Sequence, residues 1–222
     1  MLVAAAVCPH PPVLVPAIAS GAAPELDDVR TACREAVAAV YDAASDIVFV
    51  VGSDGAQRAT TFAPWGADEP VEVPEPLPLA LLVGGWLTRG RSRSFVVVDD
   101  ALDPQECAEL GRELAEAAGR VALLVMGDGS ARHTEKAPGY LDPRAPAYDA
   151  EVARALAAGD ADALLALDPD EARALMVAGR APWQVLAGAA ASAGPPQVGA
   201  GLQAAPYGVG YHVFTWRWQE NA

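Results

Sequence analysis

The stretch MLVAAAVCPHPPVLVP, residues 1–16, decides how the chain begins to fold. Leu2–Val7 is an apolar run of strand length, and it ends in the segment CPHPP at 8–12. Each proline fixes its own φ at about −65° and removes a backbone donor. The prolines also push the preceding residues toward extended conformations. His10 is therefore predicted to lie on stiff backbone at a strand end, where open α/β sheets bind their ligands.

Outward from this start, apolar strands alternate with helical segments. Strands are predicted at 46–51, 94–98 and 121–126, and helices at 24–43, 77–88, 103–118, 145–158, 160–166, 168–178 and 182–191. The tail, 197–218, predicts two strands around Pro206-Tyr207-Gly208. This alternation predicts a three-layer α/β domain with a mainly parallel or mixed sheet, helices on both faces and a C-terminal hairpin. Because no linker or repeat divides the chain, residues 1–222 are expected to form one domain.

The composition excludes several classes of function. The net charge of −14 argues against binding to nucleic acids or anionic membranes, because neutralising phosphates requires a basic surface. No apolar run reaches the roughly 18 residues needed to span a bilayer. Cys8, Cys33 and Cys107 are widely spaced and form no metal-binding pair, so a reduced, cytoplasmic chain is expected.

Three loops follow predicted strands, at 8–19, 52–76 and 127–144, and in a parallel sheet such loops share one edge. Their ionisable and nucleophilic residues are His10, Ser53, Asp54, Asp128, Ser130, His133 and Glu135. Two histidines and one carboxylate hold Fe(II) with open positions for substrate. A metal site would therefore combine His10 and His133 with Asp54 or Asp128. His212, in the last predicted strand, is expected to be structural.

Ser130 offers a different chemistry. It follows an apolar strand in the segment GDGS at 127–130, so a metal-independent hydrolase with Ser130 as nucleophile and His10 or His133 as base is an alternative. The segment does not match the nucleophile-elbow pattern G-x-S-x-G. The glycine-rich turns at 52–55 and 127–129 match neither a P-loop nor a dinucleotide-binding motif.

Four motifs, in order along the chain, resemble one known family. They are CPHPP at 8–12; GDGS at 127–130 with APGYLDPR at 137–144 and Tyr148-Asp149; AGR at 178–180 with VLAGA at 185–189; and PYGVGY at 206–211. Together they resemble the catalytic subunit of the class III extradiol ring-cleavage dioxygenases and the related Memo-like proteins. The resemblance covers nearly the whole chain. It implies one α/β domain with a non-haem Fe(II) site, in which two histidines and a glutamate hold the metal and a third histidine acts as acid and base on a catechol-like substrate.

The same resemblance assigns roles to positions in this sequence. His10 matches the first metal ligand, and Asp54 or a neighbour stands where the second histidine is expected. Ala131 stands at the acid/base position, with His133 two residues further on. No glutamate matches the third ligand around 176–178. A change from histidine to aspartate favours harder ions, and loss of an acid/base group removes roughly 10²–10⁴ in rate.

Three hypotheses about function follow. The first is an extradiol dioxygenase-like protein that lacks the standard Fe(II) site and ring cleavage but retains a pocket for a small ligand or partner. The second is an active metalloenzyme that uses His10 with Asp54 and His133, with Fe(II) as its cofactor. The third is a metal-independent hydrolase or transferase that uses Ser130 or Ser53. Asp128 and His133 are further catalytic candidates. The oligomeric state also stays undecided, and a homo-oligomer is one option, because Trp216 and Trp218 could pack on a second copy or in the core.

Overall fold

The apolar run at the start of the chain forms strand β1 (Leu2–Cys8), and all of its residues are buried. In the computed structural model, which describes residues 1–219, β1 lies beside β6 (Val121–Met126), followed by β2 (Ile47–Ser53) and β5 (Ser94–Val98), all parallel. On its other side β1 pairs antiparallel with β9 (Tyr211–Arg217). The strand order β5-β2-β6-β1-β9-β7 is therefore a mixed sheet with a parallel core, as predicted.

The tail contains three strands rather than the two predicted. Besides β9, the short strands β7 (Gln197–Val198) and β8 (Leu202–Ala204) both pair antiparallel with β9. They are separated by a glycine-rich segment in which Gly201 lies against the ring of Phe214, so close that a Cβ would overlap it. Strands β8 and β9 form the expected C-terminal hairpin. A separate pair, β3 (Arg58–Ala59) and β4 (Leu77–Pro78), lies outside the main sheet.

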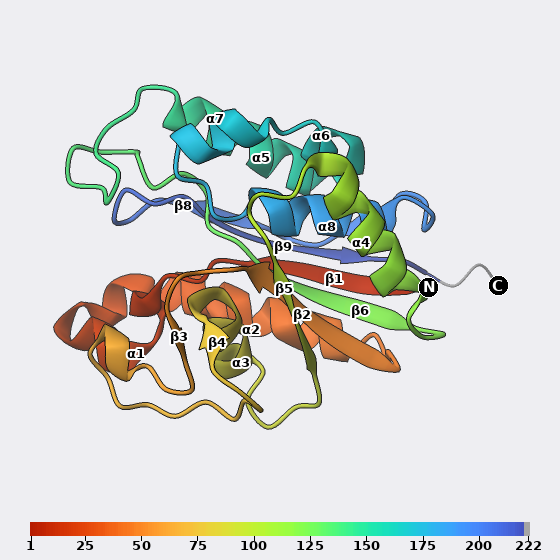
Figure 1. Ribbon diagram of the computed structural model, residues 1–222, viewed down its shortest axis with the longest axis horizontal. Helices are drawn as coiled ribbons and strands as arrows, with labels where there is room; N and C mark the ends of the chain where they lie inside the picture. The colour runs from red at the N-terminus through yellow and green to blue at the C-terminus, as the bar shows by residue number, and fades with distance from the viewer. Residues whose placement is uncertain (220–222) are drawn as a thin grey trace.

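Helices cover both faces of the sheet, which gives the predicted three layers (Figure 1). The face below the sheet in Figure 1 carries α1 (Pro16–Ala19), α2 (Asp27–Tyr41) and α3 (Leu79–Leu87). The opposite face carries α4 (Pro104–Glu116), α5 (Ala145–Ala158), α6 (Ala161–Leu165), α7 (Pro169–Ala174) and α8 (Arg180–Ala190). Short 3₁₀ turns occupy Pro12–Leu14, Ser20–Leu26 and Ala63–Trp65. No helix within residues 1–219 has the length and apolar character needed to cross a membrane.

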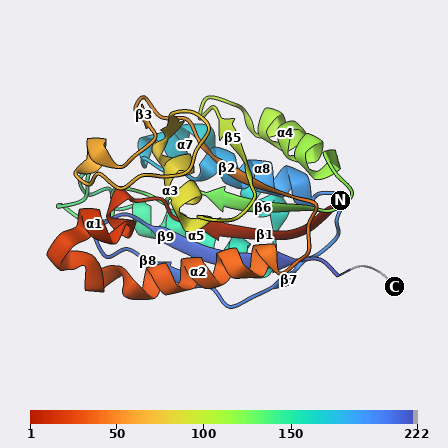
Figure 2. The ribbon, with the colours of Figure 1, turned by 90° about the horizontal axis from the view of Figure 1, so that it is seen from below.

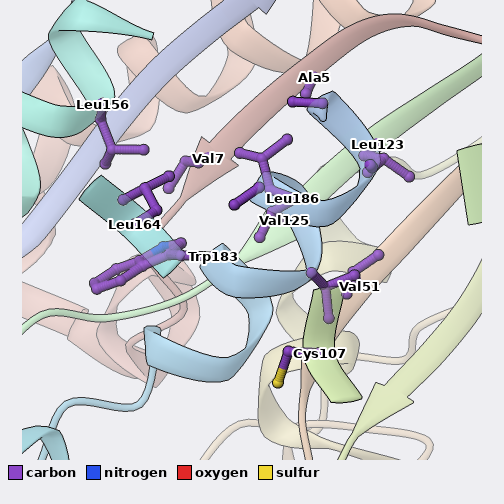
Figure 3. Close-up of a cluster of buried hydrophobic side chains, with 14 of the residues drawn as sticks. Ala5, Val7, Val51, Cys107, Leu123, Val125, Leu156, Leu164, Trp183 and Leu186 are labelled. Carbon is purple, nitrogen blue, oxygen red and sulfur yellow. The ribbon is translucent and has the colours of Figure 1, made fainter. Parts of the chain in front are cut away.

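Alternating side chains divide the interior into two cores. In β6, Leu123 and Val125 pack toward α8, whereas Leu124 and Met126 pack toward α2 and α3. Figure 3 shows the first core, in which Trp183 and Leu186 of α8 lie over the sheet. Because the central strands are covered on both faces, they read as continuous apolar runs in the sequence.

Several helix boundaries differ from the prediction. Leu77 and Pro78, predicted to open a helix, form strand β4, and the helix predicted at 168–178 ends at Ala174. The first long helix begins at Asp27 rather than residue 24, because Ser20–Leu26 forms a 3₁₀ turn. The buried guanidinium of Arg30 donates to the carbonyl oxygens of Ala23 and Leu14 and so holds that turn in place. Helix α8 begins at Arg180, two residues before the predicted start.

The tail tryptophans belong to the chain's own packing. Trp216 is 2% exposed, and its Nε1 donates to the carbonyl oxygen of Leu156 at 2.8 Å. Trp218 lies edge-on to Trp216 with ring centroids 6.1 Å apart, and it donates to the carbonyl oxygen of Gly194. Of the two roles that the sequence left open for Trp216, the structure supports the core role.

Helices α4 and α8 approach each other through glycine. A Cβ at Gly111 would overlap the carbonyl oxygen of Val185, and one at Gly188 would overlap the backbone of Ala108. Glycine is needed at both positions because the two backbones are in direct contact. This contact fixes α8 against the sheet and therefore fixes the segment that precedes α8 at the sheet edge.

We expect Gly111→Ala to lower the free energy of unfolding by about 2 kcal/mol, because overpacking at a rigid backbone contact outweighs the gain in helix propensity. Urea denaturation followed by circular dichroism measures the change. Gly21→Ala is the matched control, since no atom lies within 4 Å of a Cβ there. Equal stabilities of the two variants would contradict the role given to Gly111.

Candidate functional site

The carboxyl ends of β1 and β6 bring His10 and Asp128 together. Cys8 pairs with Met126 in the parallel ladder, so His10 and Asp128 each lie two residues beyond that pair. The backbone N–H of His10 donates to Oδ1 of Asp128 at 2.7 Å, and Nδ1 of the His10 ring is 3.9 Å from the same oxygen. The loops after these two strands therefore converge, as predicted.

Both members of this pair are held away from water. His10 is 7% exposed, and its Nδ1 is a buried atom without a hydrogen-bond partner among residues 1–219. Burial raises the pKa of Asp128, because desolvation disfavours the ionised carboxylate; the nearby His10 ring and the bond from its backbone N–H act in the opposite direction. A buried polar atom without a partner costs roughly 1–3 kcal/mol. Such costs concentrate where side chains serve a function.

A second centre forms around Asp149, which α5 places at the same edge with 1% of its surface exposed. Its Oδ2 is 2.5 Å from Nε2 of His133, the histidine that the sequence proposed as a metal ligand or catalytic group. The backbone N–H of Ser130 donates to both carboxylate oxygens, at 3.0 and 3.2 Å. Asp149 thus joins α5 to the loop after β6 and fixes the ring of His133.

His212, the third histidine of the chain, also lies beside Asp149. It lies in β9, fully buried, with Nε2 3.6 Å from Oδ1 of Asp149. Its ring meets the Trp183 indole edge-to-face, with centroids 5.7 Å apart. Within residues 1–219 neither ring nitrogen has a hydrogen-bond partner. The position in the last strand matches the expectation for His212, but its contact with Asp149 was not foreseen.

Glycines make room for the Asp149 carboxylate. A Cβ at either Gly129 or Gly210 would overlap its oxygens. The same two residues join the loop after β6 to the C-terminal hairpin, since the N–H of Gly129 donates to the carbonyl oxygen of Gly210 at 2.7 Å. The N–H of Gly210 donates in turn to the carbonyl oxygen of Ser130 at 2.9 Å.

Asp54 is not brought to His10. By register it lies two residues beyond Gly52, which pairs with Met126, yet its carboxylate turns to Nη2 of Arg58 at 2.8 Å and to the N–H of Gly55 at 2.7 Å. Among residues 1–219 no group of three or more histidine, cysteine, aspartate or glutamate side chains is placed to hold a metal ion. The residues expected to hold Fe(II) therefore do not fit that ion in this arrangement.

Ser130 does not have the setting of a nucleophile. It is fully buried, and its Oγ donates to the carbonyl oxygen of Leu175 at 2.7 Å and accepts from the N–H of Arg132 at 3.2 Å. The Ser130 hydroxyl therefore bonds to the backbone on both sides, and this setting gives no support to the expectation of a nucleophilic Ser130. Of the other loop candidates, Ser53 is buried at the end of β2 and Glu135 is exposed.

The segment before α8, where the resemblance expects a glutamate, lies against the site. Val177 forms an isolated bridge with Ser130, and the N–H of Gly179 donates to the carbonyl oxygen of Asp128 at 2.8 Å. A hollow of about 300 Å³ borders this segment. Its lining includes Asp100, Pro169, Arg173, Met176, Val177 and Arg180. The hollow thus borders the segment whose Gly179 contacts Asp128, but neither His10 nor Asp128 is among its lining residues.

Sequence reasoning missed Asp149, His212 and Gly210 as parts of the site. One signal was available for Asp149, because it lies on the apolar stripe of its helix together with Tyr148 and Val152. A charged residue on a core-facing stripe needs a partner. Gly210 belongs to the motif PYGVGY at 206–211, but nothing in the sequence relates it or His212 to Asp149, since the fold alone brings β9 to that carboxylate.

We expect Asp149→Asn to destabilise the fold by about 2 kcal/mol, because hydrogen bonds to a charged acceptor contribute roughly 1.5–3 kcal/mol and the amide replaces that acceptor. Thermal and urea unfolding measure the change. Asp170→Asn is the control, since Asp170 forms a surface pair with Arg173 and its side chain is 90% exposed. Equal effects of the two substitutions would contradict the role of Asp149.

Asp128→Asn tests the raised pKa of Asp128. A raised pKa in the folded state means that the ionised group costs stability. This cost is absent below the ordinary pKa of about 3.8 and grows as pH rises above it. His10 and His212 reduce the cost, whereas Asp149 increases it. We expect the variant to be more stable than the wild type at about pH 7.5 and to lose that advantage as the pH falls toward 3.8. A pH-independent difference in the free energy of unfolding would contradict this account.

Comparison with known proteins leaves the family of the chain open. No protein-family model matches the sequence, and a search among proteins of curated function finds no match.

Proposed function

We propose that this chain is a class III extradiol dioxygenase-like protein that does not form the iron triad and does not cleave aromatic rings. It binds a small hydroxylated molecule at the carboxyl edge of its sheet. The support in the sequence is the order of motifs, from CPHPP at 8–12 to PYGVGY at 206–211. The support in the fold is the three-layer α/β arrangement with His10 directly after the first strand.

One observation carries the proposal. The ring of His10 lies 3.9 Å from the Asp128 carboxylate with its Nδ1 unbonded, while Asp54 turns away to Arg58. A histidine and a single carboxylate are too few for the facial triad of an Fe(II) oxygenase. They do form a donor and acceptor pair for hydroxyl groups.

The chemistry of the ligand follows from the same groups. An imidazole nitrogen accepts from or donates to a hydroxyl according to its tautomer, and a carboxyl with raised pKa does the same according to its protonation. A compact molecule with neighbouring hydroxyls, such as a catechol, satisfies both groups at once. The proposal places the ring in the hollow beside Val177, which borders the segment that contacts Asp128, although His10 and Asp128 are not themselves among its lining residues.

The proposal also assigns the chain to a reducing compartment, the cytoplasm. Cys8, Cys33 and Cys107 are all free and buried. Burial raises the pKa of the Cys107 thiol to about 11, which keeps it in the unreactive protonated form.

The test separates ligand binding from iron chemistry. Calorimetric titration with simple catechols is expected to give binding by the wild type, and at least a tenfold loss on His10→Ala, because roughly 1.4 kcal/mol of contact energy corresponds to a factor of ten. Asp54→Asn is the matched control and should bind like the wild type, since Asp54 lies at the same edge but turns to Arg58.

The same three proteins are then incubated with Fe(II) without oxygen, and the bound metal is measured. We expect substoichiometric iron in all of them and no ring cleavage when oxygen is admitted. Stoichiometric iron that is lost in both His10→Ala and Asp54→Asn, together with cleavage of a catechol, would establish the metalloenzyme instead. Failure of every catechol to bind the wild type would contradict the ligand class.

A further inference from the structure

Strand β5 leaves one edge of the main sheet open. It pairs with β2 alone, and Figure 2 shows it as the outermost strand on its side of the sheet. Among residues 1–219 no backbone hydrogen bond reaches its outer side. Its sequence, SFVVV, contains no charge and no proline. Natural edge strands normally carry charged residues or prolines that protect them, because an open edge readily pairs with another strand.

The ladder with β2 fixes which backbone groups of β5 face outward. The N–H of Asp54 donates to the carbonyl oxygen of Val98 at 2.8 Å, so the polar groups of Val98 point toward β2. Successive residues of a strand direct their N–H and C=O groups to opposite sides. The N–H and C=O groups of Phe95 and Val97 therefore point away from the sheet.

The geometry points to a homodimer in which β5 pairs antiparallel with β5 of a second copy, joining the two sheets into one. A two-fold dimer uses the same surface of both chains. The outward groups and the charges at the strand ends together set the register. Phe95 of each chain lies opposite Val97 of the other and exchanges both hydrogen bonds, which also brings Arg93 opposite Asp99 of the second copy. Val96 then lies opposite Val96 of the second copy on the symmetry axis.

This register gives the exposed side chains suitable neighbours. Val97 is 36% exposed, and the dimer covers it with Phe95 of the second copy, an aromatic and β-branched pair that stabilises strand pairing. Arg93, whose guanidinium lies 5.6 Å from the centroid of the Phe95 ring, comes opposite Asp99 of the second copy. Opposite charges in facing positions favour this antiparallel register over a parallel one.

A second copy is favoured over an unrelated partner because this charge pattern complements itself. The basic segment RSR at 91–93 precedes β5, and the acidic pair at 99–100 follows it. An antiparallel copy places each basic end against an acidic end, and the two matches are related by symmetry. Pairing through β5 leaves the His10 edge of the site outside the strand contact.

Sedimentation velocity of the full chain tests the dimer. We expect a species of twice the 22.9 kDa chain mass at micromolar concentration. Val97→Lys should shift it to monomer, with at least a tenfold weaker dimer, because a lysine on the edge opposes pairing. Leu141→Lys is the control, since Leu141 is a similarly exposed residue in the loop after β6, and it should stay dimeric. A monomeric wild type, or a Val97→Lys variant as dimeric as the control, would overturn the inference.

Disulfide trapping tests the register. In a non-hydrogen-bonded antiparallel pair the Cα atoms are about 4.5 Å apart, which a disulfide can bridge. Val96→Cys should therefore cross-link to itself in oxidised glutathione, whereas Val97→Cys, which faces Phe95, should cross-link much more slowly. Faster trapping of Val97→Cys would refute this register, and no trapping of either variant would refute the strand pairing.

Discussion

Asp149 lies inside the fold with 1% of its surface exposed, and a charge buried so deeply must be met by hydrogen bonds or by opposite charge. Its oxygens are met by the N–H of Ser130 and by the ring of His133. The space for it exists only because Gly129 and Gly210 have no Cβ. One carboxylate on α5 therefore dictates how the loop after β6 and the start of β9 come together.

The position of His10 depends on a different constraint, the register of β1 against β6. That register brings His10 and Asp128 to the same level beyond the strand ends, and it is set by core packing on both faces of the sheet. His212 in β9 links the two centres, because it lies 3.6 Å from Asp149 and its charge also influences the pKa of Asp128. The edge thus behaves as one electrostatic unit carried by neighbouring strands.

The architecture was accessible from the sequence because it rests on local patterns. The strands at 94–98 and 121–126 match their predicted bounds, because each is a continuous apolar run. In 121–126 that run reflects a strand covered on both faces. The start of α2 was misplaced because the tertiary bonds of Arg30 hold a 3₁₀ turn before the helix, and no local pattern records those bonds.

The site was accessible only in part. The rule that loops after parallel strands converge correctly joined His10 to Asp128. It could not tell that Asp54, at the same level of the next strand, would turn its side chain to Arg58. A rotamer choice of this kind depends on a partner four residues away as much as on the fold. Asp149 and His212 were not predicted as parts of the site, because only the complete fold brings these two residues together.

The direction of the Asp54 side chain also decides what His10 can do. With a second and third ligand, an imidazole at this edge would be a metal ligand. With Asp128 alone as its neighbour, it is a hydrogen-bonding group whose Nδ1 is unbonded. One carboxylate oxygen of Asp128 already accepts a hydrogen bond from the backbone N–H of His10. This bond fixes the loop but does not constrain the His10 ring. Among residues 1–219 the edge therefore lacks a third ligand of the kind a facial triad needs, and the proposed binding of hydroxyl groups rests on His10 and Asp128.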